Sequence, residues 1–337
     1  MDRMYVPILK CKKGEQSALF NLTDDIKDKI IPLIEIPYSS ATTKKPIIEL
    51  IGSFWSERTF FFYFMPEWYD NSLEELQELI VNEIIPVVQN NKYAIPVFDL
   101  SVFSSISEVD IISQNGIAIR LRDNEFGQIE DMLNPLFNDN ILDRRSTDLI
   151  LDLQYVAEKD LFSKTAVLKS AFSDLDVAAD FRSIIISSVS FPKTVSDLEV
   201  GQIYRFKRME VDIFTLALKL EKRFGFKYYY SDYGPTDNED VAFVIGMSPN
   251  FKIKYTTFGD FLCIKGLSLK RGGLDIGNVQ QLAEILVNSS DFSGATYSWG
   301  DEKIYLLANK QYNSPGNLTT WVSYAMNHHI TFITHQI

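Results

Sequence analysis

The stretch IIPLIEIP at residues 30–37 is almost continuously apolar and carries a single charge, Glu35, near its end. A run of this length and composition is typical of a parallel strand that is buried on both faces of its sheet. Seven similar runs lie elsewhere in the first 235 residues, and most of them precede an amphipathic helical pattern. They are Tyr5–Cys11, Thr59–Met65, Tyr93–Asp99, Gly116–Arg122, Asp148–Gln154, Ser183–Val189 and Lys227–Tyr233.

The alternation of strand and helix patterns predicts an α/β fold with a parallel sheet. Helical patterns occupy residues 72–89, 126–137, 160–175 and 210–225, and the first begins with Ser72 and Glu75 in a capping-box arrangement. Eight strand-like runs favour a TIM-like (β/α)₈ barrel, while a doubly wound open sheet stays the alternative.

Residues 236–337 have a different pattern, which predicts a C-terminal α+β extension packed over or beside the barrel. The segment FKIKYTTFGDFLCIKGLSL at residues 251–269 alternates in polarity, as two adjacent strands joined around Thr257–Asp260 would. A helical pattern follows at residues 278–290. We therefore expect two parts, a barrel at residues 1–235 and an extension at residues 236–337.

The chain is acidic, with a net charge of −12, and this disfavours general binding to nucleic acid because phosphate backbones are repelled. Two lysine-rich clusters are candidates for local basic patches, although solvated loop side chains are the simpler interpretation. The clusters are Lys10, Lys12 and Lys13, and Lys265, Lys270 and Arg271.

The two cysteines, Cys11 and Cys263, provide no disulfide framework and no zinc-binding spacing. The apolar run at the N-terminus is too short for a signal peptide, and no stretch approaches the roughly 20 apolar residues of a membrane span. We therefore expect reduced thiols, no membrane association and a cytoplasmic location.

Three carboxylates, Glu35, Asp99 and Asp152, lie late in apolar runs, where an isolated charge is costly. They fall on the second, fourth and sixth predicted strands, and side chains from alternate strands share a layer in a barrel. Oxygen ligands converging at a barrel mouth suit Mg²⁺ or Mn²⁺, which gives one hypothesis. The alternatives are ion pairing with Arg120, helix capping by Asp99, and a polar pocket without metal.

The strand ends also carry positive charge at Lys10, Arg120 and Arg122. Arg120 and Arg122 are two residues apart and should face the same way, toward the lumen or toward the helices. Inside the lumen they could bind a carboxylate or phosphate, neutralise the acidic set, or both. Asp232 ends the eighth run beside the first strand, so it could pair with Lys10. The predicted site therefore comprises Lys10, Glu35, Asp99, Arg120, Asp152 and Asp232.

Several familiar catalytic patterns are missing from the sequence. It has no nucleophile elbow, no glycine-rich nucleotide loop, and histidines only at His328, His329 and His335. His328 or His329 could act as a general acid or base only if the C-terminal segment covers the barrel mouth.

Seven segments follow one another in a characteristic order: MYVPILKCKKGE (residues 4–15), IIPLIEIP (30–37), PVFDLS (96–101), YSDYGP (230–235), IKYTTFGDFLCIKG (253–266), YSWGD (297–301) and GNLTTWVSYAMNHHIT (316–331). In their order and spacing the chain resembles the phage "beta protein" family over nearly its whole length. This resemblance implies a setting in T-even-like phages and bacterial mobile elements, but no established activity. Family features fall on Lys10, Gly14, Glu15, Ser231, Asp232, Tyr233, Tyr255, Thr256, Lys265, Gly266, Ser298, Gly300, Asp301, Trp321, His328 and His329. Lys265 stands where the family has Arg more often, which would weaken any bidentate phosphate contact there.

Two functions remain open at this point. The first is a polar pocket for a small polar or phosphorylated ligand, with hydrolase or lyase chemistry assisted by Mg²⁺ or Mn²⁺. The second is a non-catalytic protein that engages a phage or host protein, as a subunit or inhibitor in an anti-phage defence complex. The sequence does not decide whether the protein is an enzyme.

Overall fold

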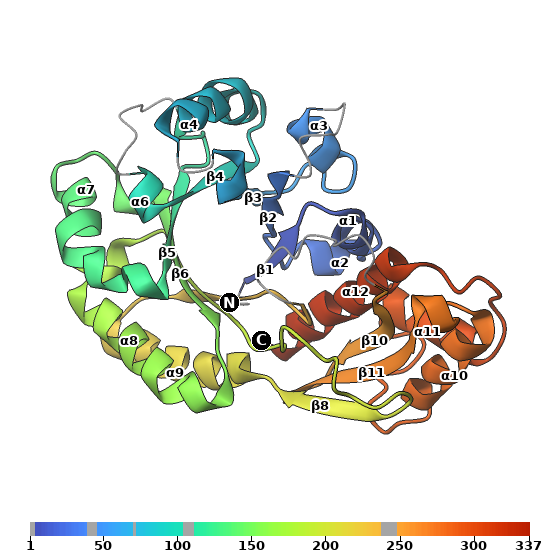
Figure 1. Ribbon diagram of the computed structural model, residues 1–337. Helices are drawn as coiled ribbons and strands as arrows, with labels where there is room; N and C mark the ends of the chain where they lie inside the picture. The colour runs from blue at the N-terminus through green and yellow to red at the C-terminus, as the bar shows by residue number, and fades with distance from the viewer. Residues whose placement is uncertain (1–3, 39–45, 70–71, 104–110, 237–247) are drawn as a thin grey trace. The chain divides into compact units, whose positions relative to one another are not determined.

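The computed structural model describes residues 4–38, 46–69, 72–103, 111–236 and 248–337 (Figure 1). The chain divides into two compact units. The barrel unit contains Met1–Cys11, Lys29–Val189 and Met209–Tyr233, and the second unit contains Lys12–Asp28, Ser190–Arg208 and Gly234–Ile337.

The barrel unit is a closed barrel of parallel strands in the order β1-β2-β3-β4-β5-β6-β7-β9. The strands are β1 (Tyr5–Lys10), β2 (Leu33–Ile36), β3 (Phe60–Phe64), β4 (Ala94–Asp99), β5 (Ile117–Arg122), β6 (Thr147–Tyr155), β7 (Ser183–Val189) and β9 (Tyr228–Asp232). Each falls within or over one of the eight apolar runs. The TIM-like barrel is thereby confirmed, and pairing of β1 with β9 rules out the open sheet.

Alternate residues of each strand point into the barrel, where they pack into one apolar core. Val6 and Ile8 of β1, Leu33 of β2, and Phe61 and Tyr63 of β3 belong to this core. The residues with the same parity nearer the C-terminal ends of the strands therefore face the lumen, and these ends meet at one mouth because all the strands are parallel.

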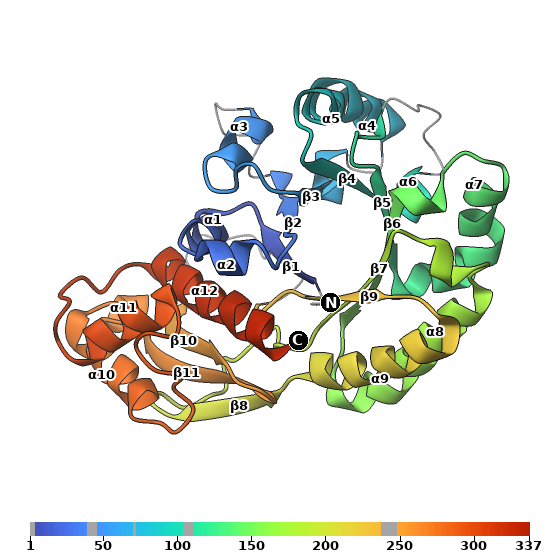
Figure 2. The ribbon, with the colours of Figure 1, turned by 180° about the vertical axis from the view of Figure 1, so that it is seen from behind.

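Helices follow most barrel strands. They are α3 (Ile47–Gly52), α4 (Leu73–Leu79), α5 (Ile85–Asn90), α6 (Leu100–Phe103), α7 (Asn134–Asn138), α8 (Leu161–Asp174) and α9 (Met209–Phe224). The two longest, α8 and α9, lie on the outer side of the barrel next to β6, β7 and β9 (Figures 1 and 2).

Two of the predicted helices contain a π turn. The segment predicted as one helix at residues 72–89 has its Ser72 cap in place, with the hydroxyl accepting from the Glu75 N–H at 3.3 Å. It then widens at Ile80–Ile84 before Pro86. The predicted helix at residues 126–137 widens at Ile129–Leu133 before Pro135. Proline lacks an N–H and crowds the preceding turn, which accounts for the local change of hydrogen bonding.

The second unit has a three-stranded antiparallel sheet in the order β10-β11-β8, with β8 at Ile203–Lys207, β10 at Asn250–Thr256 and β11 at Asp260–Ser268. Its helices are α1 (Lys13–Phe20), α2 (Asp24–Lys27), α10 (Ile276–Val287), α11 (Trp299–Ala308) and α12 (Leu318–Gln336). Side chains of α10, α11 and α12 pack with one face of β10 and β11 into a single core. Figure 2 shows these helices beside the two strands. The predicted strand pair, its turn at Thr257–Asp260 and the helix near residues 278–290 are present, so the α+β extension is confirmed.

The observed division differs from a single boundary at residue 235. Residues 190–208 join the second unit because β8 pairs with β11, and residues 12–28 join it because α1 packs along α12. Gly14 makes the α1 contact possible, since an added Cβ would lie 2.8 Å from Val322 Cγ1. No helix in the described part of the chain has both the length and the apolar character needed to cross a membrane.

Candidate functional site

The C-terminal ends of the barrel strands carry a dense set of charged side chains. Glu35 is next to last in β2, Asp99 ends β4, Arg120 and Arg122 lie in the last three residues of β5, and Asp152 lies on β6. The three carboxylates therefore occupy the second, fourth and sixth strands, as predicted from the sequence. The three carboxylates and Arg120 are buried, whereas the Arg122 side chain is 24% exposed.

Arg120 is the centre of the first cluster. Its Nη1 donates to Glu35 Oε1 at 2.9 Å, while its Nε and Nη2 donate to Asp152 Oδ2 at 3.1 and 2.7 Å. Nη2 also donates to the hydroxyl of Tyr233, and that hydroxyl donates to Asp152 Oδ2 at 2.6 Å. Glu35 and Asp152 come from strands on different sides of β5, so Arg120 points into the lumen and neutralises part of the acidic set.

Arg122 forms a second cluster of the same design. Its Nη1 donates to Asp99 Oδ2 at 2.8 Å and its Nη2 to the Tyr63 hydroxyl at 3.0 Å. Tyr63 in turn donates to Asp99 Oδ2 at 2.6 Å. The two arginines thus face the same side of β5, as their spacing predicted, and each shares a tyrosine with the carboxylate that it binds.

The two tyrosines remain neutral hydrogen-bond donors. Burial raises the pKa of Tyr63 well above its ordinary value, and the neighbouring Asp99 carboxylate raises this pKa further. Burial likewise raises the pKa of Tyr233; the Arg120 charge opposes this change but does not reverse it. A neutral phenol can accept from an arginine and donate to a carboxylate at the same time, which is the role both residues have here.

Asp152 is held in its ionised form. Burial alone would raise the pKa of this carboxyl, but the Arg120 charge and the hydrogen bonds from Tyr233, Arg120 and the Gln154 N–H lower it below its ordinary value of 3.8. Asp152 Oδ1 accepts the Gln154 N–H at 3.0 Å, so both of its oxygens have partners. This carboxylate therefore fixes Arg120 in place.

Four buried side-chain atoms on the barrel strands have no hydrogen-bond partner among the described residues. They are Glu35 Oε2, Asp99 Oδ1, Ser187 Oγ and Ser231 Oγ. Ser187 and Ser231 are opposite each other on β7 and β9, and Ser187 is also opposite Asp152. Such atoms are costly, by about 1–3 kcal/mol each, and they mark places where a ligand or water can bind.

The two clusters together hold two guanidinium groups and three carboxylates, and Lys10 adds a third positive charge at the same end of the barrel. Within the described ranges, no group of three or more His, Cys, Asp or Glu side chains is placed to hold a metal ion. Glu35 and Asp152 instead share Arg120, while Asp99 binds Arg122. The oxygens that remain available for an ion or a ligand are Glu35 Oε2 and Asp99 Oδ1.

Lys10 and Asp232 lie at the ends of neighbouring strands, as expected. Lys10 is opposite Glu35 and has the parity of the lumen residues on β1. Asp232 accepts from Tyr5 at 2.6 Å and from Tyr230 at 2.9 Å. Because neighbouring residues of a strand point to opposite faces, this carboxylate lies on the other face of β9 from Tyr233. We therefore do not count Asp232 among the lumen residues.

Sequence reasoning missed the two tyrosines of the site. Tyr63 lies within the aromatic run of β3, and Tyr233 follows β9 directly, so both resemble packing residues. Strand alternation could have identified them, because residues two apart on a strand face the same side. Tyr63 therefore faces the lumen with Phe61, and Tyr233 faces it with Ser231. Ser187 and Ser231 could have been identified in the same way.

The second unit contains a separate buried network around Asp301 and His328, both with no exposed surface. Asp301 Oδ1 accepts from Tyr255 at 2.7 Å, and Oδ2 accepts from Ser298 at 2.6 Å. His328 Nδ1 lies 2.8 Å from Asp301 Oδ2, and its Nε2 lies 2.9 Å from the Thr256 carbonyl. Both ring nitrogens therefore lie within hydrogen-bond distance of an oxygen of the protein.

The histidine pair lies on helix α12, where His329 Nδ1 is 2.8 Å from Thr256 Oγ1. Segments far apart in the sequence therefore meet at this network, and each polar group of Asp301 and His328 has a partner. The arrangement holds the sheet, α11 and α12 together, which is a structural role. Lys265, from a cluster considered as a basic patch, donates to the carbonyl oxygens of Ser196 and Leu198.

The fold and the charged mouth define the protein as an α/β barrel protein with a polar site at the C-terminal ends of its strands. The family model described as "Beta protein" matches residues 5–335, so the chain belongs to the beta protein family. Comparison with curated proteins and with solved structures finds no match.

Proposed function

We propose that the mouth of the barrel binds a small polar or phosphorylated molecule. The observation that carries this proposal is the pair of buried carboxylate oxygens, Glu35 Oε2 and Asp99 Oδ1, without a hydrogen-bond partner in the described part of the chain. The other oxygen of each carboxylate is held in place, Glu35 Oε1 by Arg120 and Asp99 Oδ2 by Arg122 and Tyr63. Glu35 Oε2 and Asp99 Oδ1 are therefore preorganised to accept from hydroxyl or amine donors of a ligand. Ser187 and Ser231 add two hydroxyls to the same set.

Arg122 supports an anionic group on this ligand, because its side chain is partly exposed while its Nη atoms are held by Asp99 and Tyr63. Guanidinium groups bind phosphate and carboxylate in a forked geometry. Lys10 ends β1, opposite Glu35 of β2, and is proposed to contribute a second positive charge. The ligand that fits these groups best has hydroxyls at one end and a phosphate or carboxylate at the other.

The catalytic form of the proposal is hydrolysis or elimination at a phosphoester. Mg²⁺ is commonly held by one or two carboxylates together with oxygens of the substrate, so Glu35 and Asp99 would be the residues that hold Mg²⁺ or Mn²⁺. Such an ion would polarise the phosphoryl oxygen. Arg120 keeps Glu35 oriented, and Arg122 would offset the charge that develops on the phosphate.

A second candidate function is a non-catalytic protein that binds a phage or host partner. One observation favours it: each of Glu35, Asp99 and Asp152 forms an ion pair with an arginine. Such pairs are expected if these charges only stabilise the barrel and take no part in catalysis. Under either proposal we place the protein in the cytoplasm, since both cysteines are buried thiols. We further propose that this ligand or partner belongs to a conflict between phage and host, a setting that the family resemblance supports.

The test is release of nitrophenolate from 4-nitrophenyl phosphate and bis(4-nitrophenyl) phosphate with Mg²⁺ or Mn²⁺. We expect turnover by the wild type, a loss of at least tenfold in Glu35→Gln and Asp99→Asn, and turnover close to wild type in Asp148→Asn. Asp148 is a matched control because it is buried on the same strand as Asp152, and its oxygens bind Arg182 and Ser183. Equal activity in all variants, or none with any ion, contradicts the catalytic form and favours the partner-binding protein.

A further inference from the structure

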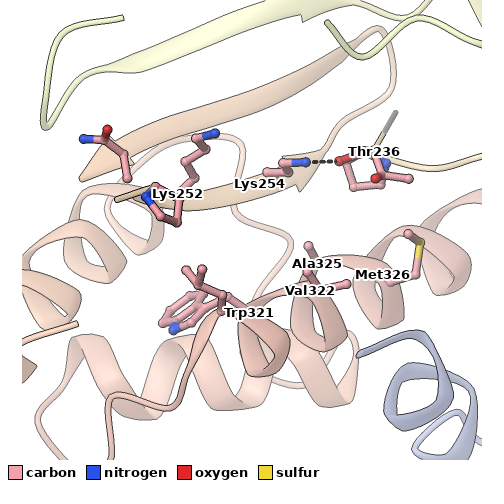
Figure 3. A pocket seen from close by; sticks show the side chains of 11 residues that line it. Thr236, Lys252, Lys254, Trp321, Val322, Ala325 and Met326 are labelled. Atoms are coloured by element: carbon pink, nitrogen blue, oxygen red, sulfur yellow. Dashed lines mark hydrogen bonds between the residues drawn. The ribbon is translucent and has the colours of Figure 1, made fainter. Parts of the chain in front are cut away.

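The second unit contains a pocket between strand β10 and helix α12 (Figure 3). Its cavity volume is about 200 Å³, which is below the usual range of drug-sized ligand sites and therefore suits only a small molecule. Lys252 and Lys254 line it from the strand, while Trp321, Val322 and Met326 line it from the helix. One side of the pocket is therefore basic and the other apolar.

The basic side comes from the alternation of β10. Phe251, Ile253 and Tyr255 point into the core of the unit, so Lys252 and Lys254 share the opposite face. Lys254 is fixed by a hydrogen bond of 2.8 Å from its Nζ to the Pro235 carbonyl oxygen. Its Nζ also lies 4.2 Å from the centre of the Phe191 ring.

Lys252 differs from its neighbour, because no group among the described residues hydrogen-bonds or ion-pairs with its ammonium. Burial lowers the pKa of Lys252, and Lys265, opposite it on β11, also lowers this pKa. The lining residues within the described part of the chain include no carboxylate. In a chain with a net charge of −12, a lysine without an acidic partner among the described residues is a positive charge that an anion would stabilise.

The apolar side is accessible to a ligand. Val322 is 40% exposed, and Leu318 is partly exposed on the preceding turn of α12. Trp321, Ala325 and Met326 are mostly buried and form the floor. The helix packs closely below them, since Trp321 meets Phe251 edge to face with ring centres 5.0 Å apart. The pocket can therefore accept an apolar body without rearrangement of the core.

We propose that this pocket binds a small amphipathic anion, with its carboxylate beside Lys252 and its apolar body against α12. The charge on the strand selects a carboxylate over an uncharged analogue, and the apolar wall supplies most of the buried area. This site is distinct from the barrel mouth, because every residue that lines it belongs to the second unit.

The test is isothermal titration calorimetry of the full chain with 4-phenylbutanoate and with 4-phenylbutan-1-ol, which differs only in lacking the charge. We expect the carboxylate to bind at least tenfold more tightly than the alcohol. Lys252→Gln should lower the carboxylate affinity at least tenfold and remove the preference over the alcohol. Lys270→Gln, which removes the same charge from an exposed turn of the same unit, should leave both affinities unchanged.

A second variant keeps the proposal testable if Lys252→Gln does not fold. Val322→Glu adds a carboxylate at a 40% exposed position of the apolar wall, so it should abolish binding of 4-phenylbutanoate. Because Val322 also lies against Gly14 of α1, thermal unfolding is measured beside binding to show that the variant is folded. Asp99→Asn, at the barrel mouth, should bind the probe normally. Equal affinity for acid and alcohol, unchanged binding in Val322→Glu, or no heat at millimolar probe would overturn the proposal.

Discussion

The two units of this protein each bury a charged network, and the two networks differ in how completely their atoms are paired. In the second unit, both oxygens of Asp301 and both ring nitrogens of His328 have partners. In the barrel, Glu35 and Asp99 each have one carboxylate oxygen with a partner and one without, within the described residues. Buried charge alone therefore does not mark a binding site. The informative feature is a buried polar atom left without a partner on an otherwise rigid framework.

The largest expected effect is the loss of Arg120. Arg120→Met leaves Glu35 and Asp152 as buried charges without their cation, which should lower the free energy of unfolding by about 3–5 kcal/mol. Urea denaturation measures this change. Arg182→Met, at the other end of the barrel, is the control and should cost clearly less, because the Arg182 side chain is 31% exposed. A cost below 1 kcal/mol for Arg120→Met, on the scale of exposed pairs, would show that the barrel network is not stabilising.

The matching change in the second unit is Asp301→Asn, which removes the charge that His328 faces. Hydrogen bonds to charged groups are each worth about 1.5–3 kcal/mol, so the free energy of unfolding should fall by roughly that amount. Ligand binding at the barrel mouth should not change. An Asp301→Asn variant with wild-type stability but altered ligand binding would reverse the roles that we assign to the two networks.

Asp152 makes the barrel sensitive to acid. Its folded pKa is lowered, so its contribution to stability is fully present above the unfolded value of 3.8 and is lost as the pH falls through the folded value. Unfolding free energies measured between about pH 5 and pH 2 should therefore fall less steeply in Asp152→Asn than in the wild type. Parallel curves for the two proteins would mean that this carboxyl titrates alike in the folded and unfolded states.

The smallest expected effect is the difference in stability between alanine variants of two buried serines on strand β7. Ser183 donates to Asp148 at 2.7 Å, whereas Ser187 has no partner in the described part of the chain. Ser183→Ala should cost about 1 kcal/mol, and Ser187→Ala should be neutral within about 0.5 kcal/mol or slightly stabilising. Thermal unfolding of the two variants measures the difference. An equal cost for both would indicate that Ser187 is already hydrogen-bonded in the folded protein.

The sequence was sufficient to predict the barrel because each strand is buried on both faces and therefore appears as a separate apolar run. It also located Glu35, Asp99, Arg120 and Asp152 at the strand ends, since polar residues in such runs stand out. The alternation of β10 and β11 predicted the strand pair of the second unit in the same way. These features are local, and local patterns are what a single sequence records.

The remaining features depend on contacts between distant parts of the chain. Pairing of β8 with β11 brings residues 190–208 into the second unit, and no local sequence pattern predicts this pairing. Tyr63 and Tyr233 resemble packing residues until Arg120 and Arg122 are placed beside them. The unpartnered oxygens of Glu35 and Asp99 follow from where their neighbours point, which only the folded barrel determines.

Thermal unfolding of the EDTA-treated protein is the most direct test of the claim that the barrel mouth is a ligand site. The probes are Mg²⁺, Mn²⁺ and ribose 5-phosphate, each alone and in combination. A probe at a hundredfold excess over its dissociation constant adds about 2.7 kcal/mol to the stability of the folded protein. The account predicts an upward shift in the wild type and in Asp148→Asn that is lost in Asp99→Asn. The absence of any shift, or the same shift in Asp99→Asn, would contradict it.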